Sequence, residues 1–467
     1  MKKNPILSKS WMPPVFIYLL VLLIAYGAAP VQVGQAYGGR YLAMLLTSLG
    51  NSNALLACLL AGTALFAAVA GLFLLCGRRK TKPVWLATAL TLTMPTTIYS
   101  QTYGSLTGAL TLVPVAALVL FYLILLEKLL DSEKKNVRYA LPLFLLGATA
   151  SLFHEALSFG LCLLSVGLTV KYWKRGWALI LHSLAACAGC VVVLLTSTEV
   201  FAAELLLERA EQVIDGVLAT NRPLLLLLTT ACLLLIQPLR AERSKRCNRI
   251  LRELLLPVLG FAVCSYLEIV PLLAALLKIA CAAVYCIGLW NTIQIYVSRE
   301  ARRHRLYRLL AAAGAFILPL LFMADQINGL LYLPCLLLTA VALLLWESAM
   351  HHYSKLEAFC RKLLPTVGIV VLCCCVWISV CNGMTDEVRR EYTRKQESAG
   401  ATEICLPEYP FAEYRAEVPV DTAIPVEECA WEDWDWSSYY AERRSSDSQE
   451  EDVEETKVIP TFQSDDE

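Results

Sequence analysis

The chain has little charge for its length. Charged residues occupy 17% of its 467 positions, below the roughly 25% typical of soluble globular domains, while hydrophobic residues occupy 57%. Its mean hydropathy is +0.57. These values exclude the ordinary classes of soluble globular protein.

Several chemical signatures are also missing. The sequence has no Walker, Rossmann or nucleophile-elbow motif, which argues against an ATPase, a dehydrogenase and a serine hydrolase. We expect no metal and no other cofactor. The basic residues lie in many separate gaps between apolar runs and form no single patch, so we expect no nucleic-acid partner.

What the sequence does have is a long series of apolar runs. A helix of about 20 apolar residues crosses the roughly 30 Å hydrocarbon layer of a bilayer with all its backbone groups bonded. The pattern therefore predicts an all-α, polytopic membrane protein with about thirteen transmembrane helices. These lie at about 14–29, 53–76, 83–98, 105–126, 139–152, 156–172, 177–196, 223–238, 254–270, 272–296, 306–324, 331–347 and 363–381.

Lysine and arginine fill every second gap between these runs, which fixes an orientation. Because basic loops stay in the cytoplasm, Lys2, Lys3 and Lys9 predict a cytoplasmic N-terminus. Thirteen spans then place the C-terminus outside. The longest outer connection, 197–222, has an amphipathic pattern and is expected to lie along the membrane surface.

The composition changes after Asn382, where 24 of the 40 acidic residues but only 8 of the 40 basic residues lie. We predict three parts: a transmembrane domain at 1–382, a small exterior segment with many aromatics at 383–444, and a disordered acidic tail at 445–467. Most of the 18 cysteines fall in apolar runs, as expected of packing side chains. Cys405 and Cys429 fall in the polar part and can pair if that part is in an oxidising compartment.

The order of several short motifs resembles a known family. These are an outer loop ending GGRYL at 38–42, an outer loop QTYGSLTGAL at 101–110, a turn with the pair His154 and Glu155, and an exterior tail with tryptophans and YYA. This arrangement resembles a family of bacterial polytopic proteins of unassigned function that is grouped with glucosyltransferase-like, GT-C type integral membrane enzymes. The resemblance covers nearly the whole chain.

The resemblance implies sugar transfer from a polyprenyl-phosphate donor to an envelope acceptor at the outer face of a bacterial cell membrane. Such enzymes use an acidic residue in the first outer loop, yet 28–42 contains no aspartate or glutamate. Glu155 is therefore the leading candidate for the catalytic base, and Asp325, at another outer turn, is a second candidate. The structural alternatives are that Glu155 is a carboxylate favoured by the positive end of a helix dipole, and that Asp325 belongs to a solvated turn.

Arg40 is one of few basic residues on the outer side of the membrane part and is the candidate for binding the donor phosphate, with Tyr41 beside it. Gln101, Tyr103 and His154 are further candidates for contacting the substrate. Arg40 could instead extend to lipid headgroups, and the others could be ordinary interfacial residues.

Two further outer charges, Glu268 and Lys278, are expected to neutralise each other as a structural pair. Two other functions stay open beside the transferase. One is a transporter or flippase of lipid-linked glycans, and the other is a non-catalytic envelope assembly partner.

Overall fold

The computed structural model describes residues 12–27, 40–76, 83–131, 137–175, 177–196, 203–239, 244–264, 271–322, 327–415 and 424–431, together with 434, 436 and 439. The chain divides into a membrane unit, residues 1–384 with 411–418, and a C-terminal unit, residues 385–410 with 419–467. Each unit is described by itself.

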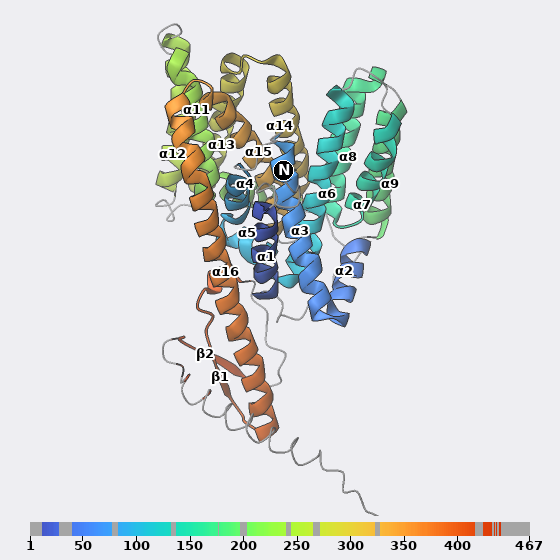
Figure 1. Cartoon of the computed structure of the whole chain (residues 1–467), viewed down its shortest axis with the longest axis vertical. Coiled ribbons are helices and arrows are strands. Elements are labelled where there is room, and N and C mark those ends of the chain that lie inside the picture. Colours follow the sequence, from blue (N-terminus) through green and yellow to red (C-terminus); the bar gives the residue numbers. More distant parts are fainter. Residues whose placement is uncertain are drawn as a thin grey trace, which may run out of the picture. The chain divides into compact units, whose positions relative to one another are not determined.

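The described part of the membrane unit is helical throughout (Figure 1). Its helices are α1 (Met12–Gly27), α2 (Tyr41–Ser52), α3 (Ala54–Leu75), α4 (Pro83–Leu92), α5 (Thr96–Thr102), α6 (Leu106–Asp131), α7 (Ala140–Ser151), α8 (Glu155–Tyr172), α9 (Trp177–Thr196), α10 (Leu206–Ile214), the π-helix η5 (Asp215–Ala219), α11 (Arg222–Ile236), α12 (Ser244–Cys264), α13 (Pro271–Tyr296), α14 (Glu300–Leu320), η7 (Gly329–Leu331), α15 (Tyr332–Met350) and α16 (Ser354–Ala399), with the short turn η8 (Ala412–Tyr414). The predicted all-α class is confirmed.

Seven of the described helices are long and apolar enough to cross a membrane, namely α3, α6, α8, α9, α13, α15 with η7, and α16. An eighth span exists if α10 with η5 and α11, which meet at a bend of 64°, are counted as one broken span. Helices α1 and α7 are apolar but shorter. A polytopic membrane protein is thus supported, while the number thirteen stays a prediction.

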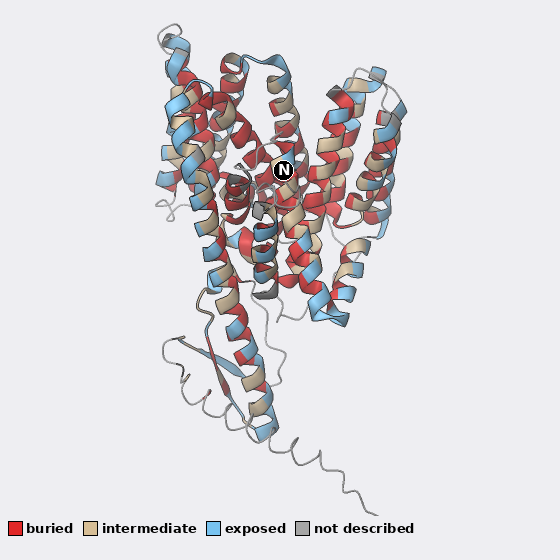
Figure 2. Ribbon diagram, viewed as in Figure 1, coloured by how far each residue is buried: buried red, intermediate tan, exposed pale blue. Residues whose placement is uncertain are grey.

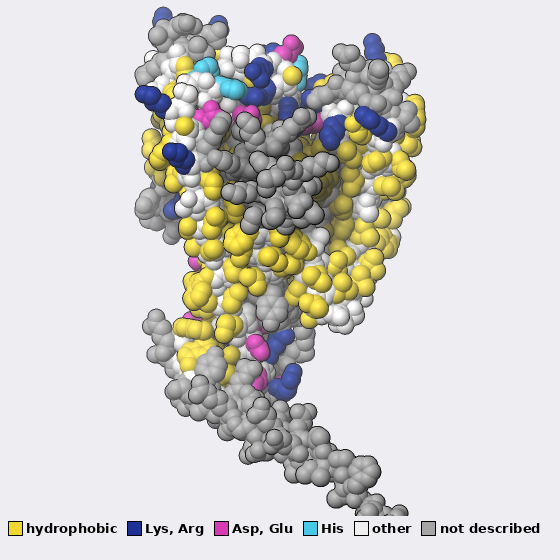
Figure 3. Space-filling model, viewed as in Figure 1, with side chains coloured by type: hydrophobic (Ala, Val, Ile, Leu, Met, Phe, Trp, Pro, Cys, Tyr) yellow, Lys and Arg dark blue, Asp and Glu magenta, His cyan; other side chains and the backbone are white. Residues whose placement is uncertain are grey.

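Lipid-facing and protein-facing surfaces can be told apart by burial. In the most apolar 18 residues of α15 with η7, 83% of the residues are buried, so this helix lies in the core (Figure 2). In the corresponding stretch of α13 only 33% are buried. Large apolar side chains such as Leu195 and Leu55 are exposed, and a broad yellow hydrophobic surface covers the helices (Figure 3). Exposed leucine side chains on this scale are expected of helices that contact lipid.

Ion pairs mark one end of the helix bundle. Arg305 near the start of α14 pairs with Glu127 near the end of α6, at 2.6 Å between Nη2 and Oε2. Arg302 donates to Ser348 at the end of α15 over 2.9 Å. The ends of α6 and α15 and the start of α14 therefore share one face, which we call the basic end. In Figure 3 the dark blue side chains visible on the described part of this unit lie mainly toward the upper edge.

The opposite face, which we call the distal end, is where α8 and α15 begin. A Cβ on Gly160, early in α8, would meet Phe316, late in α14, so these two helices run antiparallel. Helix α16 starts just after the end of α15 and reaches the distal end by Ser379, whose hydroxyl bonds that of Tyr99 in α5 over 3.3 Å. The chain thus enters α16 at the basic end and passes the distal end near residue 382.

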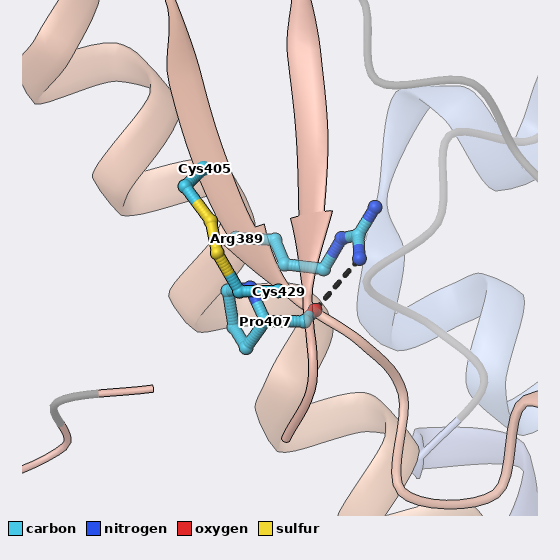
Figure 4. The surroundings of a disulfide bond; sticks show 4 residues. All are labelled: Arg389, Cys405, Pro407 and Cys429. Carbon is cyan, nitrogen blue, oxygen red and sulfur yellow. Dashed lines mark hydrogen bonds between the residues drawn. A yellow bond between two sulfur atoms is a disulfide. The ribbon is translucent and has the colours of Figure 1, made fainter. Parts of the chain in front are cut away.

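The C-terminal unit contains a two-stranded parallel sheet of β1 (Ile404–Pro407) and β2 (Val426–Cys429). A disulfide joins Cys405 to Cys429 across it (Figure 4). The side chain of Arg389, 5% exposed, donates to the carbonyl of Pro407 over 2.7 Å and pairs with Glu428 over 2.8 Å. The pairing of the two tail cysteines, which the sequence left conditional, is present in the structure.

Candidate functional site

Two candidate residues that are 115 positions apart meet at the distal end. The Nε of Arg40, which immediately precedes α2, donates to Oε2 of Glu155, the first residue of α8, over 3.0 Å. The Glu155 side chain is 2% exposed and that of Arg40 is 20% exposed. The backbone supports this meeting, because the amide of Leu42 donates to the carbonyl of Leu152 over 3.1 Å. The pair is buried on its acidic side and reaches solvent on its basic side.

Local helix chemistry explains why a carboxylate is tolerated here. Glu155 is at the first position of α8, where the exposed backbone amides give the helix a positive end. Arg40 supplies a full positive charge as well. A buried carboxylate needs such compensation, since desolvation would otherwise favour its neutral form.

His154 completes the cluster as the N-cap of α8. Its Nδ1 accepts a hydrogen bond from the amide of Ala156 over 3.3 Å and lies 3.4 Å from Oε2 of Glu155. Burial, and secondarily the Arg40 charge, lowers the pKa of His154 well below its usual value. The imidazole is therefore neutral at pH 7. We call Arg40, His154 and Glu155 the distal cluster.

The other predicted site residues have different surroundings. Gln101 accepts a hydrogen bond from the amide of Gly329 over 2.6 Å. Tyr103 is 2% exposed, and its hydroxyl bonds the hydroxyl of Tyr332 and the carbonyl of Thr91. Both side chains thus connect helices at the distal end.

Two predicted site residues are left to place. Tyr41 is 46% exposed at the start of α2. Asp325 lies outside the described residues, so its proposed role stays a prediction.

Lys278, another charged residue at the distal side, has two partners that were not predicted from the sequence. Lys278 of α13 pairs with Glu211 of α10 over 2.7 Å and with Asp215 of η5 over 2.8 Å. The expected partner, Glu268, lies outside the described residues. Glu211 and Asp215 are four residues apart on the helix expected to lie on the membrane surface, and this spacing was the available signal. Through these two carboxylates the segment packs on α13, and its position along the membrane surface stays a prediction.

Two further features of the structure, a small cavity and a cluster of cysteines, were not predicted from the sequence. A small cavity at the distal end is lined by Tyr103, Ser379, Asn382, Tyr414 and Arg415. Asn382 holds residues 411–415 there, because its side-chain amide both donates to and accepts from the backbone of Phe411.

A cysteine cluster was also missed. Cys187 and Cys190 form a C-x-x-C pair in α9, and the sulfur of Cys187 lies 3.4 Å from that of Cys162 in α8. Among the described residues, no group of three or more His, Cys, Asp or Glu side chains is arranged to hold a metal ion.

Comparisons with known proteins give no relative. No protein-family model, no curated protein and no solved structure matches this chain.

Proposed function

We propose that the distal end lies outside the cytoplasm of a bacterial cell, and that the basic end faces the cytoplasm. Two independent observations support this orientation. Arg302 and Arg305 of α14 lie at one end of the bundle, and basic residues at the ends of spans are typical of the cytoplasmic side. The chain passes the other end near residue 382 before it reaches the disulfide of Cys405 and Cys429, and disulfides persist in oxidising compartments.

At this outer face we propose that the protein transfers a sugar from a polyprenyl-phosphate donor to an envelope glycan acceptor. The observation that carries the proposal is the ion pair of Arg40 and Glu155, which joins the proposed phosphate-binding cation to the proposed base. Sugar transfer needs a cation for the leaving phosphate and a carboxylate for the acceptor proton. The distal cluster supplies both at one place.

The proposed step balances as follows. Glu155 takes the proton of an acceptor hydroxyl, the acceptor oxygen forms a bond to the anomeric carbon, and the bond from that carbon to the phosphate oxygen breaks. The electron pair leaves with polyprenyl phosphate, whose negative charge Arg40 stabilises.

The ion pair links the two proposed roles. A donor phosphate attracts the Arg40 guanidinium. The Glu155 carboxylate, which this guanidinium bonds over 3.0 Å, then becomes available to the acceptor hydroxyl.

The test measures incorporation of labelled sugar into envelope lipid or polymer in a deletion strain complemented with each variant at equal membrane level. Arg40→Ala and Glu155→Gln should both abolish the product, and Arg40→Lys should retain part of it because the charge remains. Arg249→Ala is the matched control, since Arg249 lies near the start of α12, forms an ion pair with Glu253 and is 77% exposed. A glycan profile that never changes with the wild-type gene would count against catalysis and favour an envelope assembly partner.

One observation favours the second candidate, a transporter or flippase of lipid-linked glycans. Discontinuous spans with nearby charges are typical of transporter binding sites. Here α10 with η5 and α11 form a bent pair, and Lys278 bonds the acidic side chains beside the bend. Under this alternative, Lys278→Met blocks export and leaves lipid-linked glycan in the inner leaflet, whereas Glu155→Gln leaves export intact.

A further inference from the structure

The tautomer of His154 follows from its hydrogen bond. The backbone amide of Ala156 can only donate, so Nδ1 must present a lone pair to it. In a neutral imidazole the other nitrogen then carries the proton. His154 is therefore the Nε2–H tautomer, with its donor on the side of the ring away from the helix start.

The Nε2–H donor is the part of His154 that its contacts with the described residues leave unused. The contacts of His154, to Ala156 and to Glu155, both involve Nδ1. Within the part of the chain that the structure describes, Nε2 has no hydrogen-bond partner. The side chain is 8% exposed, and its Nε2 is not fully enclosed by protein atoms. A buried N–H donor of this kind needs an acceptor from outside the protein.

We propose that His154 Nε2–H donates to a phosphate oxygen of the polyprenyl-phosphate donor, as a neutral positioning group beside the Arg40 charge. This inference rests on the proposed function. The distal cluster then offers the phosphate one cation and one neutral donor.

Protonating His154 would reverse this arrangement. The charged groups that act on the ring are Glu155, which lies 3.4 Å from Nδ1, and Arg40, which acts through its positive charge. An imidazolium would present Nδ1–H to Glu155 at 3.4 Å and lose the bond from Ala156, so the N-cap of α8 would be lost. Capping by Nδ1 thus keeps the ring in the form that serves the substrate.

Two substitutions separate the capping role from the substrate role. His154→Asn keeps a strong N-cap but has no group at the position of Nε2. His154→Gln caps poorly, but its longer side chain places an N–H near the position of Nε2. A purely structural histidine would thus tolerate asparagine, and a substrate-binding histidine would not.

The expected result with the full chain in bilayers is a split between stability and kinetics. His154→Asn should melt at the wild-type temperature, with KM for the polyprenyl-phosphate sugar raised roughly 10- to 100-fold and KM for the acceptor unchanged. His154→Gln should melt lower and show a smaller rise in the donor KM. An unchanged donor KM in His154→Asn overturns the proposal, and so does a rise confined to the acceptor KM.

A second measurement does not depend on activity. Nitrogen-15 NMR of histidine-labelled protein in bilayers, with the His154→Asn spectrum subtracted, reports the tautomer directly. A neutral Nε2–H ring at pH 7 is expected, and a neutral Nδ1–H ring or an imidazolium overturns the inference. A wild-type protein that shows the expected tautomer but transfers no sugar would overturn the proposed function, and with it the donor role of Nε2.

Discussion

The energy of the Arg40 and Glu155 pair can be measured with a double-mutant cycle. Arg40→Ala leaves a carboxylate that is 2% exposed without its nearest cation, and removing one partner of a fully buried pair costs about 3–5 kcal/mol. Because Arg40 itself is 20% exposed, water reaches part of the site, and we expect a loss of about 2–4 kcal/mol.

The reverse change should cost less. Glu155→Gln leaves Arg40 able to turn toward solvent, so we expect a loss of about 1–2 kcal/mol. The double variant leaves neither charge uncompensated and should lose less than the sum of the single variants, with a coupling of about 1–3 kcal/mol. A coupling energy of this size would come from the uncompensated Glu155 charge and not from lost packing.

The assay is reversible unfolding of the full chain in mixed micelles titrated with denaturing detergent. A parallel cycle on Arg249 and Glu253, whose arginine is 77% exposed, is the control and should give about 0.3–0.5 kcal/mol. If the Arg40 and Glu155 changes add within about 0.5 kcal/mol, the two groups are independent in solution and the reasoning about the distal cluster is wrong.

Three other predictions test separate parts of the structure. Cys405→Ser opens a loop closed by a bond to Cys429, 24 residues away, and should destabilise the C-terminal unit by about 3–4 kcal/mol, seen as faster limited proteolysis; digestion equal to wild type would contradict it. Gly104→Ala would overlap a backbone carbonyl oxygen and should cost about 1–3 kcal/mol, whereas Gly314→Ala, with open space around it, should gain about 0.5–1 kcal/mol; equal melting temperatures would refute this contrast. Lys278→Met leaves two carboxylates without their shared cation and should cost about 2–4 kcal/mol in the same micelle titration, and a loss below about 1 kcal/mol would show that water already screens them.

The long apolar helices could be predicted from sequence because hydropathy is a local property. The runs expected at about 53–76 and 156–172 correspond to α3 at Ala54–Leu75 and α8 at Glu155–Tyr172. The run at about 83–98 was expected as one span, but it divides into α4 and α5 around Pro95. Proline has no backbone N–H to continue a helix and restricts the residue before it, so the division has a local cause that the hydropathy pattern hid.

The partners of charged residues could not be predicted in the same way. The sequence indicated that Arg40 and Glu155 were unusual outer charges, but only the packing of α2 near the start of α8 brings them within 3.0 Å. The partner expected for Lys278 was Glu268, ten positions away, whereas the structure pairs it with residues 63 and 67 positions away. Helix packing decides such contacts, and one sequence carries little information about it.

The distal cluster is hard to explain by stability alone. A buried ion pair is weak evidence for stability, because apolar side chains of similar size often replace one at no cost or with a gain. The positive end of α8 already favours a first-turn carboxylate, so anchoring the helix start does not require Arg40. His154 also caps this helix in a neutral form, where serine or asparagine would serve as well. An arginine, a buried carboxylate and a histidine with one nitrogen left for a ligand are more than helix capping needs, and each has a role in the sugar transfer that we propose.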